Sequence, residues 1–313
     1  MRSPARTCVV PEGLAGAMLD QAVRTLFGLS WGRARALIDR GKVRVDDELA
    51  TVHTTPVRAG ASLVLDPAAR APRGAALGRE AIVHLDAHVV VVRKPAGVST
   101  VPFDEREHGT LDELVRAHLA STASSRRERP NLGVVHRLDR ETTGLVVFTR
   151  TWLAKKSLSA QFRDHSVTRR YFAIVHGILT RPATYRSHIM EDRGDGLRGS
   201  WEARPRKGPP AGQHAVTHVE PVEPLAGATL VACRLETGRT HQIRVHLSEA
   251  GHPLVGERVY VRGRAVREIP APRLMLHATT LGFVHPKTEE AMIFEEPIPR
   301  DMREVIAALA RGP

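Results

Sequence analysis

The chain carries, between two apolar runs, the stretch His136-Arg137-Leu138-Asp139-Arg140-Glu141-Thr142-Thr143-Gly144. The runs on either side, residues 133–135 and 145–148, have the length and composition of short buried strands. We therefore expect Asp139 to lie on a turn that is held firmly from both sides. Nearby arginines would favour the ionised form of its carboxylate. This pattern is typical of a nucleophile in a basic site, although a surface turn with a salt bridge has the same pattern.

The stretch from His136 to Gly144 resembles the signature of the RluA-type pseudouridine synthases, which convert uridine in RNA to its C-glycoside isomer. An upstream segment, residues 86–97, is similar to the family's first strand and its Lys-Pro-Ala-Gly turn. Matches in the family's order over about 200 residues are far more specific than any single motif. The other matching segments are 170–177 (Arg-Tyr-Phe-Ala-Ile-Val-His-Gly), 237–247 (Thr-Gly-Arg-Thr-His-Gln-Ile-Arg-Val-His-Leu), 251–256, 276–278 and 283–286.

This resemblance assigns chemistry to three side chains. Asp139 would be the essential carboxylate, acting either as a nucleophile at C1′ or as a base at C2′, and both roles need its lone pair. Arg244 would pair with Asp139, and Tyr171 would stack on the flipped base and take the C5 proton. Each residue also has a simpler interpretation. Arg244 could alternate with Ile243 and Val245 on a strand and face solvent, and Tyr171 could be an ordinary core aromatic.

The resemblance also implies contacts with RNA. Arg137 would enter the base stack when the uridine leaves it, because a planar cation can stack on bases and reach phosphates. The histidines show no zinc-site spacing and no glycine-rich phosphate loop precedes a helix, so neither a metal nor an organic cofactor is expected. The other residues expected to contact RNA near Asp139 are Arg140, Arg239, His241 and Gln242.

Charge and composition agree with an RNA partner. The 313 residues include 46 Lys and Arg against 34 Asp and Glu, a formal net charge of +12, which favours a polyanion as the partner. The two cysteines, Cys8 and Cys233, supply no disulfide framework, which fits a reducing compartment. No apolar run approaches the ~20 residues of a membrane span, and no signal core follows the first residues. We expect a cytoplasmic protein, with no membrane partner, that acts as a monomer.

The first 66 residues are expected to form a separate small domain. Apolar residues recur at helical spacing over 14–26, and Ser30 and Gly41 are suited to cap a second helix over 31–40 before a strand over 42–45. The pattern resembles the S4-like RNA-binding module, with Ser-Trp-Gly-Arg in place of the module's Ser-Arg-Ser. A solvated basic helix face is the alternative. The cations expected to contact phosphates are Arg33, Arg35, Arg40, Lys42 and Arg44.

Residues 67–79 are predicted to be a linker, and residues 80–313 an α+β catalytic domain on a largely antiparallel, mixed sheet. Thr151, Ala154, Leu158 and Phe162 mark the buried side of a helix after the Asp139 turn. Strands are predicted over 229–235 and 291–294, and a long surface excursion over 186–213. These segments and domain bounds together define the expected fold.

The expected substrate is one or a few uridines of 23S ribosomal RNA, or of its precursor, in loops where bases can be splayed out. The S4-like module followed by a synthase domain favours a large structured RNA. Synthases without the extra module also modify transfer RNA, so transfer RNA remains an alternative target. A catalytically inactive RNA-binding or ribosome-assembly factor that keeps the fold is the alternative from another class, and a His-rich metal hydrolase would need ligands that the sequence does not assemble.

Overall fold

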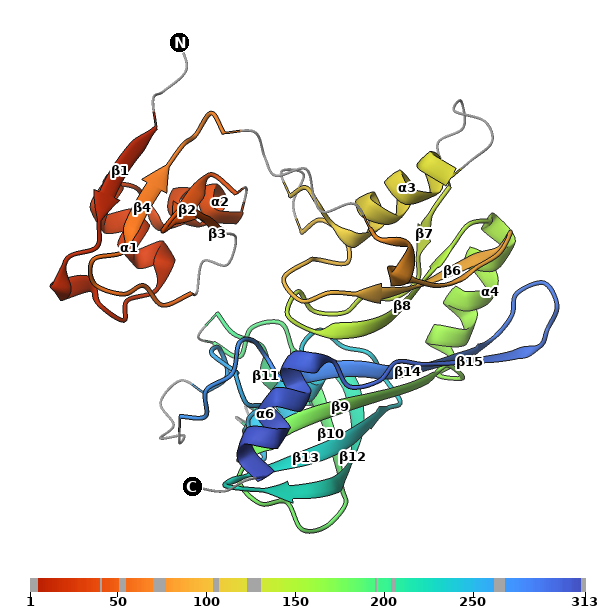
Figure 1. The fold of residues 1–313 in the computed structure, drawn as a ribbon. Coiled ribbons are helices and arrows are strands. Elements are labelled where there is room, and N and C mark those ends of the chain that lie inside the picture. Colours follow the sequence, from red (N-terminus) through yellow and green to blue (C-terminus); the bar gives the residue numbers. More distant parts are fainter. Residues whose placement is uncertain are drawn as a thin grey trace. The chain divides into compact units, whose positions relative to one another are not determined.

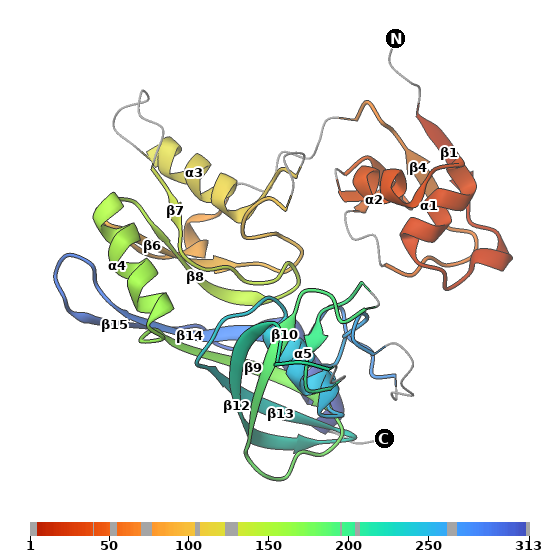
Figure 2. The same ribbon diagram turned by 180° about the vertical axis from the view of Figure 1, so that it is seen from behind.

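The computed structural model describes residues 5–39, 41–50, 55–69, 77–103, 107–122, 131–194, 196–203, 207–261 and 268–310. The chain divides into two compact units (Figures 1 and 2). The first comprises Met1–Gly78 with Val101–His118, and the second comprises Arg79–Thr100 with Leu119–Pro313. The first unit thus includes a short segment that the sequence analysis assigned to the catalytic domain.

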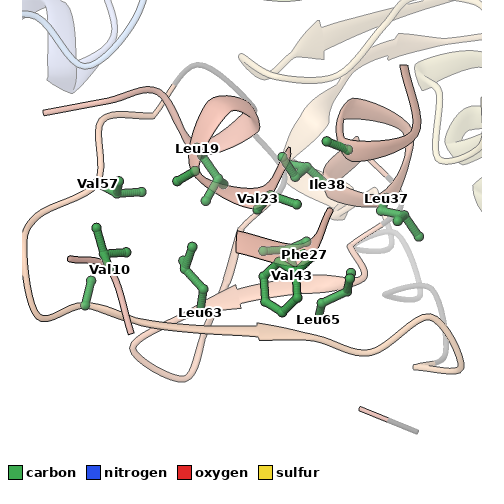
Figure 3. Close-up of a cluster of buried hydrophobic side chains, with 13 residues drawn as sticks. Val10, Leu19, Val23, Phe27, Leu37, Ile38, Val43, Val57, Leu63 and Leu65 are labelled. Atoms are coloured by element: carbon green, nitrogen blue, oxygen red, sulfur yellow. The ribbon is translucent and has the colours of Figure 1, made fainter. Parts of the chain in front are cut away.

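The N-terminal part of the first unit is a four-stranded antiparallel sheet covered by two helices. The sheet order is β1-β4-β2-β3. Side chains from both helices and the sheet form one buried core, which Figure 3 shows with Leu19, Phe27 and Leu63 among its members. The elements are β1 (Arg6–Val9), η1 (Glu12–Leu14), α1 (Leu19–Phe27), α2 (Trp31–Asp39), β2 (Val43–Val45), β3 (Glu48–Ala50) and β4 (Ser62–Leu65).

The sequence predicted the second of these helices more accurately than the first. Helix α2 begins at Trp31, and the Oγ of Ser30 accepts a hydrogen bond from the Arg33 backbone N–H at 3.3 Å, as expected of an N-cap. The prediction of a helix from residue 14 is wrong, because α1 begins only at Leu19. Gly16 has φ 77°, a left-handed conformation that interrupts a helix, and the preceding residues form only a 3-10 turn.

The second unit is built on a large mixed sheet, which confirms the predicted α+β class. The strand order is β11-β10-β12-β13-β9-β14-β8-β6-β5, with β15 paired to β14 and β7 paired to β8. Among the described residues, β8 and β14 form the one parallel pair. The strands are β5 (Ile82–Leu85), β6 (Val89–Lys94), β7 (Gly133–Val134), β8 (Thr143–Thr149), β9 (Thr168–His176), β10 (Ala183–Met190), β11 (Gly199–Ser200), β12 (Gln213–Leu225), β13 (Ala228–Leu235), β14 (Leu276–Val284) and β15 (Ala291–Glu295).

Helices pack beside this sheet, and α4 confirms the predicted buried stripe. The Thr151 hydroxyl caps α4 by accepting a hydrogen bond from the Ala154 backbone N–H at 3.2 Å, and Ala154 and Leu158 are buried against β8 and β14. The predicted surface excursion over 186–213 is wrong at its start, since β10 continues to Met190. The remaining elements of the second unit are η2 (Arg79–Ala81), α4 (Trp152–Arg163), α5 (Gln242–Glu249) and α6 (Arg300–Ala310), and α3 (Leu111–Thr122) begins in the first unit.

Gly144 allows β8 to pass close to β14 directly after the Asp139 turn. Its φ is 117°, and a Cβ atom added to it would lie 2.1 Å from the carbonyl oxygen of Ala278. Because both the conformation and the space exclude a side chain, Gly144→Ala should lower the free energy of unfolding by at least about 3 kcal/mol. Urea unfolding measures this loss. Gly13→Ala is the control, since nothing lies within 4 Å of a Cβ there, and equal stability of the two variants would contradict the prediction.

Candidate active site

The turn that carries Asp139 is fixed by hydrogen bonds from a neighbouring segment. The Thr100 hydroxyl donates to the Leu138 carbonyl at 2.9 Å and accepts from the Leu138 backbone N–H at 3.0 Å. Within the turn, the Thr142 N–H donates to the Asp139 carbonyl at 3.0 Å. The expectation that Asp139 lies on a firmly held turn between β7 and β8 is confirmed.

Lys94, the last residue of β6, clamps the same turn from inside. Its side chain is buried, and its Nζ donates hydrogen bonds to the carbonyls of Pro95, Arg140 and Thr142 at 2.8–2.9 Å. Burial lowers the pKa of Lys94 to about 7, although the charges of Glu141 and Asp139 oppose the change. The three carbonyl contacts use all three N–H groups of the ammonium form, so Lys94 stabilises the turn when it is protonated.

Arg244 faces the Asp139 carboxylate from helix α5. One guanidinium nitrogen lies 3.6 Å from Asp139 Oδ2, and the two side chains are 11% and 22% exposed. The alternative of a solvent-facing arginine on a strand is excluded, because Arg244 is helical and nearly buried. A fixed cation beside Asp139 restricts the orientation of its carboxylate.

Glu257 orients this arginine. Its side chain is fully buried, and its two oxygens accept hydrogen bonds from Nε and a terminal nitrogen of Arg244 at 2.7 and 2.9 Å. Glu257 also accepts backbone N–H groups of Arg258 and Val259. Burial raises the pKa of Glu257, but the Arg244 hydrogen bonds and charge outweigh burial, so that the pKa is lowered overall. Two parallel hydrogen bonds of this kind hold the planar guanidinium in one orientation.

His241 lies beside Asp139, and Tyr171 lies on β9. The Nε2 atom of His241 lies 3.9 Å from Asp139 Oδ1. Tyr171 lies on β9, is 8% exposed, and pairs with Cys233 of β13 and Ala278 of β14. Burial raises the pKa of Tyr171; Arg169 opposes this change and the Asp139 charge adds to it. The tyrosine is therefore protonated at neutral pH and close enough to sense the charge of Asp139.

Most of these residues lie in a segment of the chain that matches a known protein family. The family model described as RNA pseudouridylate synthase matches residues 88–249, which include Asp139, Tyr171 and Arg244. The chain belongs to this family. Two bacterial relatives named ribosomal large subunit pseudouridine synthase D align along nearly their whole length. The Zymomonas mobilis protein is 34% identical over 96% of each chain, and the Pseudomonas aeruginosa protein is 36% identical over 97% of this chain and 95% of its own.

Solved structures agree on the synthase fold. Human RNA pseudouridylate synthase domain containing 4 superposes with a TM-score of 0.59 at 22% identity, covering 74% of this chain and 93% of its own. Human RNA pseudouridylate synthase domain containing 1 gives a TM-score of 0.55 at 25% identity, covering 73% of this chain and 94% of its own. The α+β architecture expected from the sequence is thus the architecture of this synthase family.

Three of the arginines predicted to contact RNA each donate a hydrogen bond to another group of this synthase. Arg137 donates to the Thr240 hydroxyl at 3.2 Å and so joins the Asp139 turn to the segment that precedes α5. The Nε atoms of Arg140 and Arg239 donate to backbone carbonyls, that of Gly97 at 2.9 Å and that of His214 at 3.0 Å. The bonds of Arg137 and Arg239 each use part of a guanidinium, which carries five N–H donors.

Gln242 requires a correction. It was predicted to contact RNA, but its side chain is 2% exposed. Its Oε1 accepts from the Thr237 hydroxyl and the Arg239 backbone N–H, and its Nε2 donates to Val216 O and Thr217 Oγ1, at 2.7–3.0 Å. Because these four hydrogen bonds occupy the amide, Gln242 holds the start of α5 in place rather than binding RNA.

Other histidines of the site segments are also structural. His136 Nε2 accepts the Val147 backbone N–H at 3.0 Å, and its ring stacks on Phe162. Burial lowers the pKa of His136 to about 3, so the imidazole is neutral. His246 contacts two hydroxyl groups, and burial lowers its pKa to about 4. Neither is placed to act on Asp139.

The residues that position the site and that the sequence did not indicate are Thr100, Lys94 and Glu257. Glu257 comes directly after the matched segment 251–256. A signal was available, because Glu257 directly follows a matched segment and its carboxylate could be a second partner for Arg244. Among the described residues, no group of three or more His, Cys, Asp or Glu could hold a metal ion. No described helix is both long and apolar enough to cross a membrane.

The basic residues predicted for the N-terminal unit lie in different settings. Arg33 and Arg44 are exposed, and Arg44 also donates to the Asp47 carbonyl at 2.9 Å. Arg35 pairs with the buried Asp20 at 2.7 Å, and Lys42 donates to the Ala69 carbonyl. Arg40 lies outside the described residues. Arg33 and Arg44 are therefore the best test of phosphate binding by this unit.

Proposed function

We propose that the protein isomerises one or a few uridines to pseudouridine in 23S ribosomal RNA, with Asp139 as the essential carboxylate. The observation that carries the proposal is the pairing of Asp139, on a turn fixed from two sides, with an arginine that Glu257 orients. The full-length similarity to proteins named ribosomal large subunit pseudouridine synthase D supports the choice of RNA.

The proposed reaction begins with extrusion of the uridine from its stack, which costs a few kcal/mol. Arg137 fills the gap, and the base enters the site beside Tyr171. Asp139 then acts as a nucleophile at C1′ or as a base at C2′, and the bond from N1 to C1′ breaks. The base turns while bound, and C5 joins C1′ as the bond from Asp139 to C1′ breaks or, on the other route, as C2′ recovers its proton from Asp139. Tyr171 takes the C5 proton while its hydroxyl releases its own proton to solvent, and N1 of the base gains a proton. Arg244 keeps the carboxylate oriented before and after the step.

The target is tested by mapping pseudouridines in total RNA from a deletion strain that carries either the wild-type gene or the Asp139→Asn variant. We expect sites in 23S ribosomal RNA to be lost in the deletion strain and restored only by the wild type. Loss of sites only in transfer RNA would contradict the target and leave the activity in place. No lost site would favour the alternative of an inactive RNA-binding or assembly factor.

For the N-terminal unit we propose an S4-like RNA-binding role, with Arg33 and Arg44 at phosphates. Replacing both by glutamine in the full chain should weaken RNA binding and lower the slope of log affinity against log salt by about 0.7–0.9 for each lost contact. Arg300→Gln is the control, since Arg300 lies on α6 and pairs with Glu304 on the surface. An unchanged slope in the double variant would show that this unit does not hold phosphates.

The domain bounds stay part of the proposal: an S4-like domain at 1–66, a linker at 67–79 and a synthase domain at 80–313.

All proposed steps use side chains and the RNA, so we propose that neither a metal nor an organic cofactor takes part. A chelator added to the purified protein should leave pseudouridine formation unchanged, and loss of turnover restored by a divalent cation would contradict this. The protein is proposed to act in the cytoplasm as a monomer.

A further inference from the structure

His241 has a backbone conformation that few side chains adopt. Its φ and ψ are 59° and 19°, in the left-handed region, and it is the residue directly before the first residue of α5. A non-glycine residue there costs free energy and persists only where surrounding contacts hold it. In this protein the conformation directs the imidazole between Asp139 and Tyr260.

The imidazole and the Tyr260 hydroxyl form a short hydrogen bond. Nδ1 of His241 lies 2.6 Å from the Tyr260 oxygen, and the rings meet edge to face. Tyr260 is 5% exposed, and burial raises its pKa to about 12, although Arg244 opposes the change. Burial lowers the pKa of His241 against the opposing charge of Asp139. At neutral pH both groups are therefore uncharged, and the imidazole carries one proton.

The surrounding charges decide which nitrogen carries that proton. The charged groups that act on His241 are Asp139, Arg244, Glu257 and Arg198, and Asp139 Oδ1 lies 3.9 Å from Nε2. A lone pair on Nε2 would be repelled by the carboxylate, whereas a proton on Nε2 would be attracted to it. A proton on Nε2 leaves Nδ1 free to accept, and the Tyr260 hydroxyl can donate.

We propose that His241 is a positioning residue for Asp139: the Tyr260 hydroxyl donates to Nδ1, and the Nε2 proton is thereby directed to Oδ1 while Arg244 faces Oδ2. The carboxylate is then held from both oxygens, by a fixed cation on one and a neutral donor on the other. The contact at 3.9 Å is longer than a hydrogen bond, and catalytic contacts of this kind tighten when substrate binds. This inference rests on the proposed function of Asp139.

Two substitutions separate the positioning role from a structural role. In His241→Gln the new amide reaches about as far as Nε2 and can still donate to Asp139. In His241→Asn the shorter amide cannot reach, although asparagine tolerates the left-handed backbone better than glutamine does. We therefore expect the two variants to rank in opposite order for stability and for activity. His241→Asn should be the more stable variant, and His241→Gln should be the more active one. The kcat of His241→Asn should fall about 10- to 100-fold, with KM for RNA unchanged.

His165 is the matched control for the backbone effect. It has φ 58°, is exposed, and lies just beyond the end of α4. His165→Asn and His165→Gln should show the same stability ranking with no change in kcat. If kcat followed stability at position 241, or if only KM changed, His241 would be a structural residue or an RNA contact and the proposal would be wrong.

The tautomer can be measured without any activity. Long-range proton–nitrogen NMR spectra of the full-length protein distinguish Nε2–H from Nδ1–H, and the signal missing in His241→Asn identifies His241. We expect the Nε2–H form in the wild type, and its partial loss in Tyr260→Phe together with a several-fold lower kcat. An Nδ1–H form in the wild type would overturn the proposal. Absence of wild-type pseudouridine formation on RNA would instead contradict the proposed function, and the NMR result would still stand.

Discussion

Asp139→Asn should abolish pseudouridine formation, with a loss of about 10⁴-fold or more in the single-turnover rate. The amide keeps the size of the carboxylate but lacks the charged oxygen that either proposed route requires. RNA affinity should stay within about twofold. The free energy of unfolding should change by no more than about 1 kcal/mol, because Glu257 still neutralises Arg244. The measurements are isomerisation of a ribosomal RNA transcript under excess enzyme, RNA binding and urea unfolding.

Glu141→Gln is the matched control, since Glu141 is the other acid of the same stretch. It should retain most of the activity, because the proposed chemistry uses only Asp139. Turnover by purified Asp139→Asn above the level explained by contaminating wild-type enzyme would contradict the assignment. Equal losses of activity in the two variants would mean that the reaction depends on the total negative charge of the turn and not on the Asp139 carboxylate in particular.

Glu257→Gln should reduce both the stability and the catalytic rate of the protein. Removing one charge of a buried, hydrogen-bonded ion pair typically costs about 3–5 kcal/mol of stability. The lower end applies here, because Arg244 keeps Asp139 as a second neighbour. The guanidinium would also turn toward Asp139, and a displacement of about 1 Å at a reacting group can reduce kcat about 100-fold. Urea unfolding and single-turnover rates measure both effects. Glu304→Gln, which breaks an exposed pair with Arg300, should change stability by at most about 0.5 kcal/mol.

The pH dependence of stability tests the same pair. The pKa of Glu257 is lowered in the folded protein from a reference of 4.5. A carboxylate with a lowered folded pKa contributes stability that is present above its unfolded pKa and is lost as the pH falls through the folded value. The wild type should therefore lose more stability than Glu257→Gln as the pH falls from 7 to below 4.5. Parallel curves for the two proteins would show that the Glu257 charge does not stabilise the fold.

The parts of the fold that the sequence predicted correctly are those determined by local pattern. The apolar runs around Asp139 predict β7 and β8, and the spacing of Ala154 and Leu158 predicts α4. The start of α1 was predicted too early, because apolar spacing continues through Gly16 although the backbone there is left-handed. A helical spacing of apolar residues does not show where a residue in the left-handed conformation interrupts the helix.

The site was predictable where a family resemblance supplied the pairing, as for Asp139 with Arg244. The contacts that orient this pair were not, because Glu257, Lys94 and Thr100 are distant from Asp139 in sequence and become neighbours only in the folded sheet. Gln242 shows the opposite error. Its polar side chain in a segment that matches the family suggested RNA, but polarity alone does not distinguish a buried, hydrogen-bonded amide from an exposed one.

The position of β14 also determines when this protein can act during its own synthesis. β14 lies between β9, which carries Tyr171, and β8, which follows the Asp139 turn, and it joins residues 143–144 to residues 277–278. Contacts so distant in sequence form late, since the chain between them must first be ordered. A nascent chain whose β14 has not yet emerged from the ribosome has no assembled active site. We therefore expect stalled or truncated chains that end before β14 to form no pseudouridine, even though they already contain Asp139, Tyr171 and Arg244.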